Sequence, residues 1–129
     1  MMDDDAQLSP LLSLSQEEVD AIPFGLIALD PDGIVVRYNK AESSLSGLDP
    51  QSVLGRNFFE QVAPCTNVRG FAGLYREMVK AREMQSWEFN FTFRFAAGAK
   101  HVHIRLAYFP QRSLGLLLVQ DLDQSGSGR

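Results

Sequence analysis

The 129-residue sequence contains one cysteine, two histidines and no apolar run near the roughly 20 residues that span a membrane. A single cysteine excludes an intrachain disulfide and argues against a secreted disulfide scaffold. The 12 basic residues are outnumbered by 16 acidic ones, and the net charge of -4 argues against nucleic acid or an anionic membrane as a partner. The acidic N-terminus is unlike a secretory signal. We therefore expect a cytoplasmic protein.

The hydrophobic content is sufficient for one core: 45% of the residues are hydrophobic, and nine are phenylalanine. The length favours a single domain. We assign residues 1–22 to an N-terminal lead-in or cap, residues 23–122 to the domain and residues 123–129 to a Gly- and Ser-rich tail or linker. Within the lead-in we expect residues 1–14 to be loosely held, and the sequence SQEE at residues 15–18 predicts a capping box that starts a short helix.

Turn and capping residues divide the next part of the chain into short elements. An apolar run over residues 25–29, the turn sequence DPDG and a second run over residues 34–38 predict a β-hairpin. Capping and helix-breaking residues then predict short helices over residues 40–45, 50–54 and 58–62. Apolar residues at helical spacing predict a longer amphipathic helix that ends near Glu83.

The C-terminal third alternates between apolar and polar residues. Trp87, Phe89, Phe91, Phe93 and Phe95 predict a strand with an aromatic core face. A turn at 96–99 and strands over 102–108 and 114–122 follow. We predict an α+β protein with a five-stranded antiparallel sheet that carries short helices and one longer helix on one face. This element order resembles the PAS fold, which by itself indicates only a ligand-binding or interaction module.

Three side chains in the middle of the sequence are candidates for chemistry. Tyr38 and Glu42 flank a strand-to-helix junction and, if both point inward, offer a phenol and a carboxyl group to one ligand atom. The alternative is a sheet-edge tyrosine and a solvated glutamate, because glutamate is rarely fully buried. Cys65 lies in a loop before the longer helix, where a thiolate would be nucleophilic. Its alternative role is that of a small buried apolar side chain.

The remaining reactive residues give weaker indications. A thiol enzyme needs a base, but His101 and His103 lie on the polar face of a late strand. The same two histidines are too few for a closed zinc site, which takes four ligands, so we expect them to be solvated. The phenylalanine stripe predicts ordinary core, although a core pocket between such rings can also hold a flat aromatic ligand. We expect neither an enzyme nor a metal site.

Taken together, these residues resemble the photoactive yellow protein family of PAS-fold blue-light receptors. The resemblance covers about residues 23–108 and needs no gap between Phe24 and Cys65. The matching motifs are Phe24-Gly25, Leu29-Asp30, Asp32-Gly33, Tyr38-Asn39, Ala41-Glu42, Asp49-Pro50, Asn57-Phe58-Phe59 and Val62-Ala63-Pro64-Cys65-Thr66.

The resemblance implies a chromophore, p-coumaric (4-hydroxycinnamic) acid, in thioester linkage to Cys65. It implies that Tyr38 and Glu42 hydrogen-bond the phenolate and that Ser46 supports the tyrosine. Further pocket positions are implied at Ile27, Phe58, Val62, Ala63, Thr66 and Phe93. Photoisomerisation is then implied to draw the proton from Glu42 and to trigger a signalling change of conformation. The implied partner is an unidentified downstream signalling protein or effector domain, and we expect a monomer or weak dimer.

The sequence also departs from the family at the mouth of the implied pocket. Leu48 stands where the family usually has an arginine, and Phe95 replaces a tyrosine. The turn at 96–99 lacks the methionine that assists thermal return of the chromophore, so we expect slow dark recovery. Two alternatives stay open. One is a PAS interaction or dimerisation module without a chromophore, and the other is a light-sensing input domain of a larger histidine-kinase-type regulator.

Overall fold

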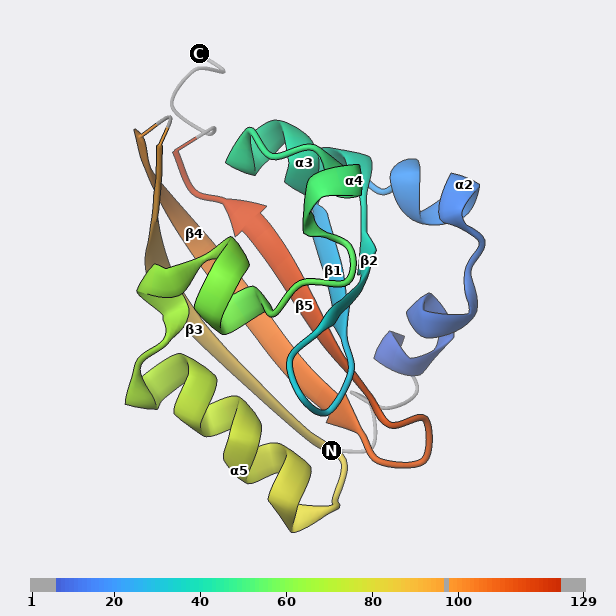
Figure 1. Ribbon diagram of the computed structural model, residues 1–129. Helices are drawn as coiled ribbons and strands as arrows, with labels where there is room; N and C mark the ends of the chain where they lie inside the picture. The colour runs from blue at the N-terminus through green and yellow to red at the C-terminus, as the bar shows by residue number, and fades with distance from the viewer. Residues whose placement is uncertain (1–6, 97, 124–129) are drawn as a thin grey trace.

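The computed structural model describes residues 7–96 and 98–123. Its strands form one antiparallel sheet in the order β2-β1-β5-β4-β3 (Figure 1), which confirms the predicted five-stranded sheet. The strands are β1 (Gly25–Leu29), β2 (Val35–Tyr38), β3 (Gln85–Phe95), β4 (Gly98–Phe109) and β5 (Leu114–Asp121). Since β1 lies between β2 and β5, the first hairpin joins the three C-terminal strands through its own first strand.

Short helical segments connect the strands, and one longer helix precedes β3 (Figure 1). They are η1 (Ser9–Ser13), α2 (Gln16–Asp20), α3 (Lys40–Ser46), α4 (Pro50–Val53), η2 (Phe58–Val62), η3 (Pro64–Thr66), η4 (Arg69–Gly73) and α5 (Leu74–Ala81). The predicted capping box is confirmed, because Ser15 and Glu18 each bond the backbone N–H of the other. The cap and the stop of α3 are confirmed as well: Asn39 accepts from the third helical amide, and Gly47 ends the helix with a left-handed φ of 78°.

The sheet has a buried core on each face. The core between the sheet and the helices α3 to α5 is aromatic and contains Phe58, Phe59, Phe71, Tyr75 and Phe93. These rings meet mainly edge to face, with Phe58 and Phe93 centroids 6.4 Å apart at 87°. This core surrounds the residues that the sequence singles out.

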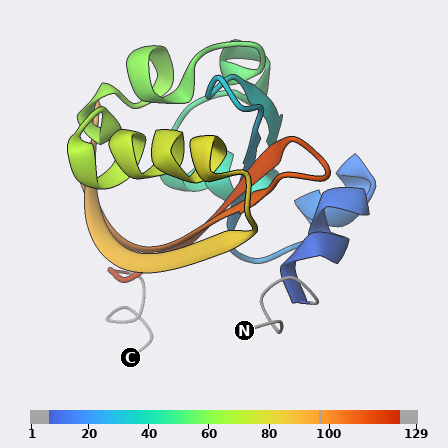
Figure 2. The same cartoon turned by 90° about the horizontal axis from the view of Figure 1, so that it is seen from below.

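The second core lies on the opposite face, under the N-terminal segment. Leu8, Leu12 and Val19 are buried there against β-strand residues such as Leu26 and Leu116. Figure 2 shows this segment on the side of the sheet away from α5. The sequence does not predict η1. The prediction that residues 1–14 are loosely held is wrong for residues 8–12, because Leu8 and Leu12 pack against the sheet.

Several predicted boundaries and one predicted burial are wrong. The longer helix ends at Ala81 rather than near Glu83, because Arg82 takes a left-handed φ of 55°. Trp87 is 51% exposed and does not join the aromatic core. Gly98 and Ala99 belong to β4 rather than to a turn, while Ala97 lies outside the described residues. So do residues 124–129, on which most of the predicted tail falls.

No helix in the described ranges is long and apolar enough to cross a membrane.

Candidate functional site

Tyr38 and Glu42 both point into the protein, with only 2% and 1% of their surfaces exposed. Tyr38 is the last residue of β2, and Glu42 lies in the first turn of α3, so the strand-to-helix junction aims both side chains at the aromatic core. The Tyr38 hydroxyl lies 2.8 Å from Ser46 Oγ at the other end of α3. Tyr38 does lie on the edge strand β2, but its side chain is buried. The solvated glutamate, which the sequence leaves open, is wrong for this chain.

Glu42 has a buried carboxyl group with an unpartnered oxygen atom. Its Oε1 atom has no hydrogen-bond partner, which is uncommon for a buried polar atom. Burial raises the pKa of Glu42 to about 8, because the charged form loses its hydration. The carboxyl group is thus mostly protonated at neutral pH and can donate a hydrogen bond. Burial also raises the pKa of Tyr38, the nearby Glu42 adds to this, and the bond to Ser46 opposes it.

Asn39 fixes the junction that carries these two residues. Its Oδ1 atom accepts from the backbone N–H of Leu26 at 2.9 Å and of Glu42 at 3.0 Å. Its Nδ2 atom donates to the carbonyl oxygens of Val19 at 2.9 Å and Phe24 at 3.0 Å. The sequence indicates Asn39 only as a helix cap, since its partners in α2, in β1 and in the loop between them lie 13 to 20 positions away.

Cys65 lies in η3 and packs, half-buried, at the margin of the aromatic core. Its Sγ atom accepts a hydrogen bond from the backbone N–H of Arg94 at 3.4 Å, which links the loop to the edge strand β3. Next to it, Thr66 is fully buried and donates from Oγ1 to the carbonyl oxygen of Ala63 at 2.7 Å. The thiol therefore has a defined place beside the core and is still reachable from solvent.

The structure brings the other implied pocket residues together with these groups. Ile27, Phe58, Ala63 and Phe93 are buried in the same core as Tyr38, and Val62 packs against it half-buried. The site thus has a closed end at Tyr38 and Glu42 and a more open end at Val62 and Cys65.

The two histidines have partners elsewhere. His103 places Nε2 2.9 Å from Glu88 Oε1 and Nδ1 2.8 Å from Asn90 Oδ1, and His101 pairs with Asp123 at 3.3 Å. Neither ring is hydrogen-bonded to the Cys65 thiol. Within residues 7–96 and 98–123 no three His, Cys, Asp or Glu side chains gather as metal ligands would.

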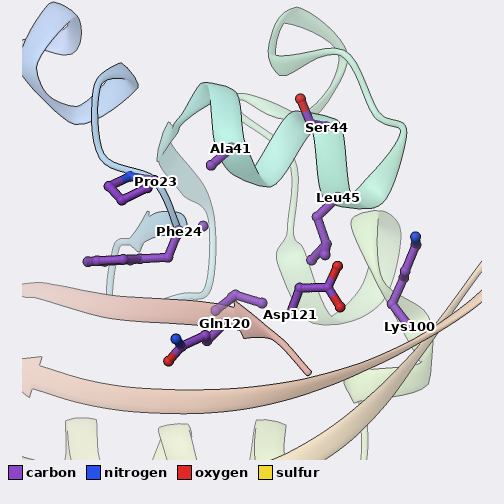
Figure 3. A pocket seen from close by; sticks show the side chains of 10 residues that line it. Pro23, Phe24, Ala41, Ser44, Leu45, Lys100, Gln120 and Asp121 are labelled. Carbon is purple, nitrogen blue, oxygen red and sulfur yellow. The ribbon is translucent and has the colours of Figure 1, made fainter. Parts of the chain in front are cut away.

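A cleft of about 490 Å³ opens behind α3, close to Glu42. Figure 3 shows Ala41 and Leu45 of α3 on one side and Gln120 and Asp121 of β5 on the other. Gly25 also lines this cleft. The wall between Glu42 and the cleft therefore includes a residue without a side chain, which the sequence does not single out.

The fold and the site together define a PAS domain. Residues 14–118 match the model of the PAS fold family. Among known proteins, the chain is 38% identical over 98 residues to a photoactive yellow protein from Halochromatium salexigens, an alignment that covers 75% of this chain and 78% of the relative. It is 35% identical over 98 residues to one from Rhodothalassium salexigens, with the same coverage.

A solved structure supports the same assignment. The crystal structure of the photoactive yellow protein domain from the sensor histidine kinase Ppr of Rhodospirillum centenum superposes with a TM-score of 0.81 at 36% identity, covering 87% of this chain and 97% of that one. The chain belongs to the photoactive yellow protein family, which binds a chromophore, and is a light-sensing PAS domain. Sensory domains of this kind are generally not enzymes.

Proposed function

We propose that this domain is a blue-light photoreceptor that carries p-coumaric acid as a thioester on Cys65. The observation that carries the proposal is the buried Glu42 carboxyl group, whose Oε1 atom has no partner, beside the buried Tyr38–Ser46 hydroxyl pair. A protein rarely buries such a group for stability alone, because an unpaired buried polar atom costs about 1 to 3 kcal/mol. A ligand oxygen at this end of the site would accept the missing hydrogen bond.

The residues present fit this chromophore. The closed end offers two donors, the phenol of Tyr38 and the protonated carboxyl group of Glu42, which suit a phenolate oxygen. The aromatic rings of Phe58 and Phe93 suit the flat ring of a hydroxycinnamoyl group. At the open end, the half-buried thiol of Cys65 suits the acyl end.

Attachment would need an activated form of the acid. The Cys65 thiolate attacks the carbonyl carbon, a C–S bond forms, and the activating group leaves with the electron pair of its bond. Once formed, the thioester keeps the ligand in the site, so the non-covalent contacts do not have to supply the binding affinity. Tyr38 and Glu42 then stabilise the phenolate, which would be costly to bury without them.

When bound, p-coumaric acid would supply the absorption of blue light and the isomerisation about its vinyl bond. Glu42 would then give up its proton and remain as a buried carboxylate. A buried charge without a partner costs several kcal/mol, which approaches the total stability of a domain. Local unfolding relieves this cost, because water then reaches the carboxylate.

The element best placed to respond is the N-terminal segment. Hydrogen bonds tie it to the Tyr38–Glu42 junction. Asn39 Nδ2 bonds the carbonyl oxygen of Val19, and the Asp20 carboxylate accepts from Lys40 N at 2.9 Å, at the start of the helix that carries Glu42. The side chain of Arg37 donates to the carbonyl oxygen of Leu14. A shift of α3 would therefore loosen this segment from the sheet and signal to an effector.

A second candidate function is favoured by one comparison. The relative with a TM-score of 0.81 is a domain of a sensor histidine kinase, so this chain can equally serve as the input domain of such a regulator. The light-sensing chemistry would be the same in either arrangement. A PAS interaction module without chromophore is the outcome against which the proposal is tested.

The test is reconstitution. Purified protein and its Cys65→Ala variant are treated with activated p-coumaric acid, and mass spectra and absorption spectra are recorded. The proposal predicts one p-coumaroyl adduct on Cys65 and a blue absorption band, both missing from Cys65→Ala. Folded wild-type protein that gains neither adduct nor band would support the interaction module instead.

A further inference from the structure

Gly25, the first residue of β1, is in close contact with the unpartnered oxygen of Glu42. A Cβ atom at position 25 would overlap Glu42 Oε1. It would also lie 3.1 Å from Val119 Cβ and 3.2 Å from the carboxyl carbon of Glu42. No real side chain tolerates the overlap, so any residue other than glycine would force the carboxyl group to move.

The backbone does not need a glycine here. Gly25 is not among the residues with a positive φ, and it lies in a regular strand that pairs with Val119 of β5. An L-residue adopts this conformation without strain. Position 25 therefore requires glycine because there is no space for a side chain beside Glu42.

The elements on both sides cannot move apart easily. Asn39 Oδ1 accepts from Leu26 N in β1 and from Glu42 N in α3, so one side chain sets the separation of the two backbones. Gly25 is the direct neighbour of Leu26, so the same bridge limits how far it can move away from α3. A larger residue at position 25 would have to displace the Glu42 side chain rather than the helix.

We infer that Gly25 is a positioning residue for Glu42: the missing side chain at position 25 sets where the carboxyl group lies and keeps it at the closed end of the site, beside Tyr38. The functional part of this inference rests on the proposed function, in which Glu42 must face the ligand. The steric part holds for the protein without any ligand.

The added Cβ atom also sets the direction of the displacement. It would stand on the Gly25 side of the Glu42 carboxyl group, and Gly25 in turn lines the cleft together with Ala41 and Leu45 (Figure 3). The carboxyl group would therefore be pushed away from Gly25 and out of its position beside Tyr38. Because the pKa of a buried acid depends on its surroundings, Gly25→Ala should shift the pKa of Glu42.

The first test is a double-mutant cycle in the protein without chromophore. Urea unfolding is measured for wild type, Gly25→Ala, Glu42→Ala and the double variant. We expect Gly25→Ala to shift the unfolding equilibrium by at least about tenfold alone, and by much less in the Glu42→Ala background. Gly70→Ala is the matched control, since no atom lies within 4 Å of a Cβ built there.

Each outcome of the cycle decides the steric part. If Gly25→Ala alone does not fold, recovery of folding in the double variant supports the inference. An equal penalty in both backgrounds overturns it, because the contact with Val119 would then be responsible. If Gly25→Ala does not fold and the double variant does not fold either, the inference is overturned too.

The second test is the titration of Glu42, followed by infrared spectroscopy through its protonated C=O band and assigned by its loss in Glu42→Gln. Wild type should titrate near pH 8, and the midpoint of Gly25→Ala should be displaced from this value. If Gly25→Ala does not fold, the double-mutant cycle alone decides the inference. An unchanged midpoint overturns the positioning role. Both tests omit the chromophore, so a failed reconstitution would refute the proposed function and leave this inference standing.

Discussion

Tyr38 Oη and Ser46 Oγ lie 2.8 Å apart in the core, and this contact joins the end of β2 to the last residue of α3. The two residues are eight positions apart and bracket Glu42. The helix that carries the buried acid is thus bound to the sheet at both of its ends, to β1 through Asn39 at its start and to β2 through Ser46 at its last residue. This double attachment defines the closed end of the site.

Removing the Tyr38 hydroxyl and removing the Ser46 hydroxyl should lower the free energy of unfolding by different amounts. Tyr38→Phe leaves Ser46 with its bond to Leu48 N, so we expect a loss of about 1 kcal/mol. Ser46→Ala leaves a buried phenol without a partner and should cost about 2 kcal/mol. Urea unfolding measures both, with exposed Ser44→Ala as the control. Equal costs for Ser46→Ala and Ser44→Ala would contradict the role of the contact.

The buried acid makes stability depend on pH. The pKa of Glu42 is raised from 4.5 to about 8, so the folded state holds a proton that the unfolded state releases. This stabilisation is complete below pH 4.5 and is lost as the pH rises through about 8, with an upper limit of about 5 kcal/mol. Chemical unfolding between pH 5 and 9 should show the decline, and Glu42→Gln should flatten it. A decline of the same size in Glu42→Gln would assign the effect to another group.

High pH should also loosen the N-terminal segment. Ionised Glu42 at pH 9 reproduces the buried charge that light is proposed to create, without any chromophore. Hydrogen exchange corrected for its intrinsic pH dependence should then rise in residues 8–21 relative to pH 6, while the centre of β5 stays protected. In Glu42→Gln this rise should disappear. Exchange that increases equally across the sheet would indicate global destabilisation and no selective coupling.

Asn39 should be the most sensitive polar position of the site. Its side chain makes four hydrogen bonds to backbone groups of three different segments. Asn39→Ala leaves buried amides and carbonyls without partners and should destabilise the domain by about 3 kcal/mol or more. The exposed Asn67→Ala is the control. A loss no larger than that of a single helix cap, about 1 kcal/mol, would contradict the bridging role.

The sequence predicts local features of the fold well. The capping box at Ser15, the α3 stop at Gly47 and the long strand β3 all follow from residues within a few positions of each other. The predicted burial of Trp87 is wrong because the exposure of a side chain on the edge strand β3 depends on which other segments cover that edge. The packing of Leu8 and Leu12 against the far face depends on β1 and β5, which lie distant in the sequence.

The candidate site shows the same division. The positions of Tyr38 and Glu42 follow from a strand-to-helix junction, and their spacing alone suggests a common direction. The long-range partners of Asn39 and the closeness of Gly25 to Glu42 follow only from the packing of α3 against β1. A single sequence shows a glycine at position 25 but not which atom requires it.

The most direct test of the central claim is a light-minus-dark infrared difference spectrum of the reconstituted protein, compared with that of Glu42→Gln. We predict that illumination bleaches the blue band of wild type and removes the C=O band of protonated Glu42, with a carboxylate band in its place. The Glu42→Gln variant should bleach without either carboxyl change. A wild-type protein that bleaches while Glu42 stays protonated would contradict the proposed switch.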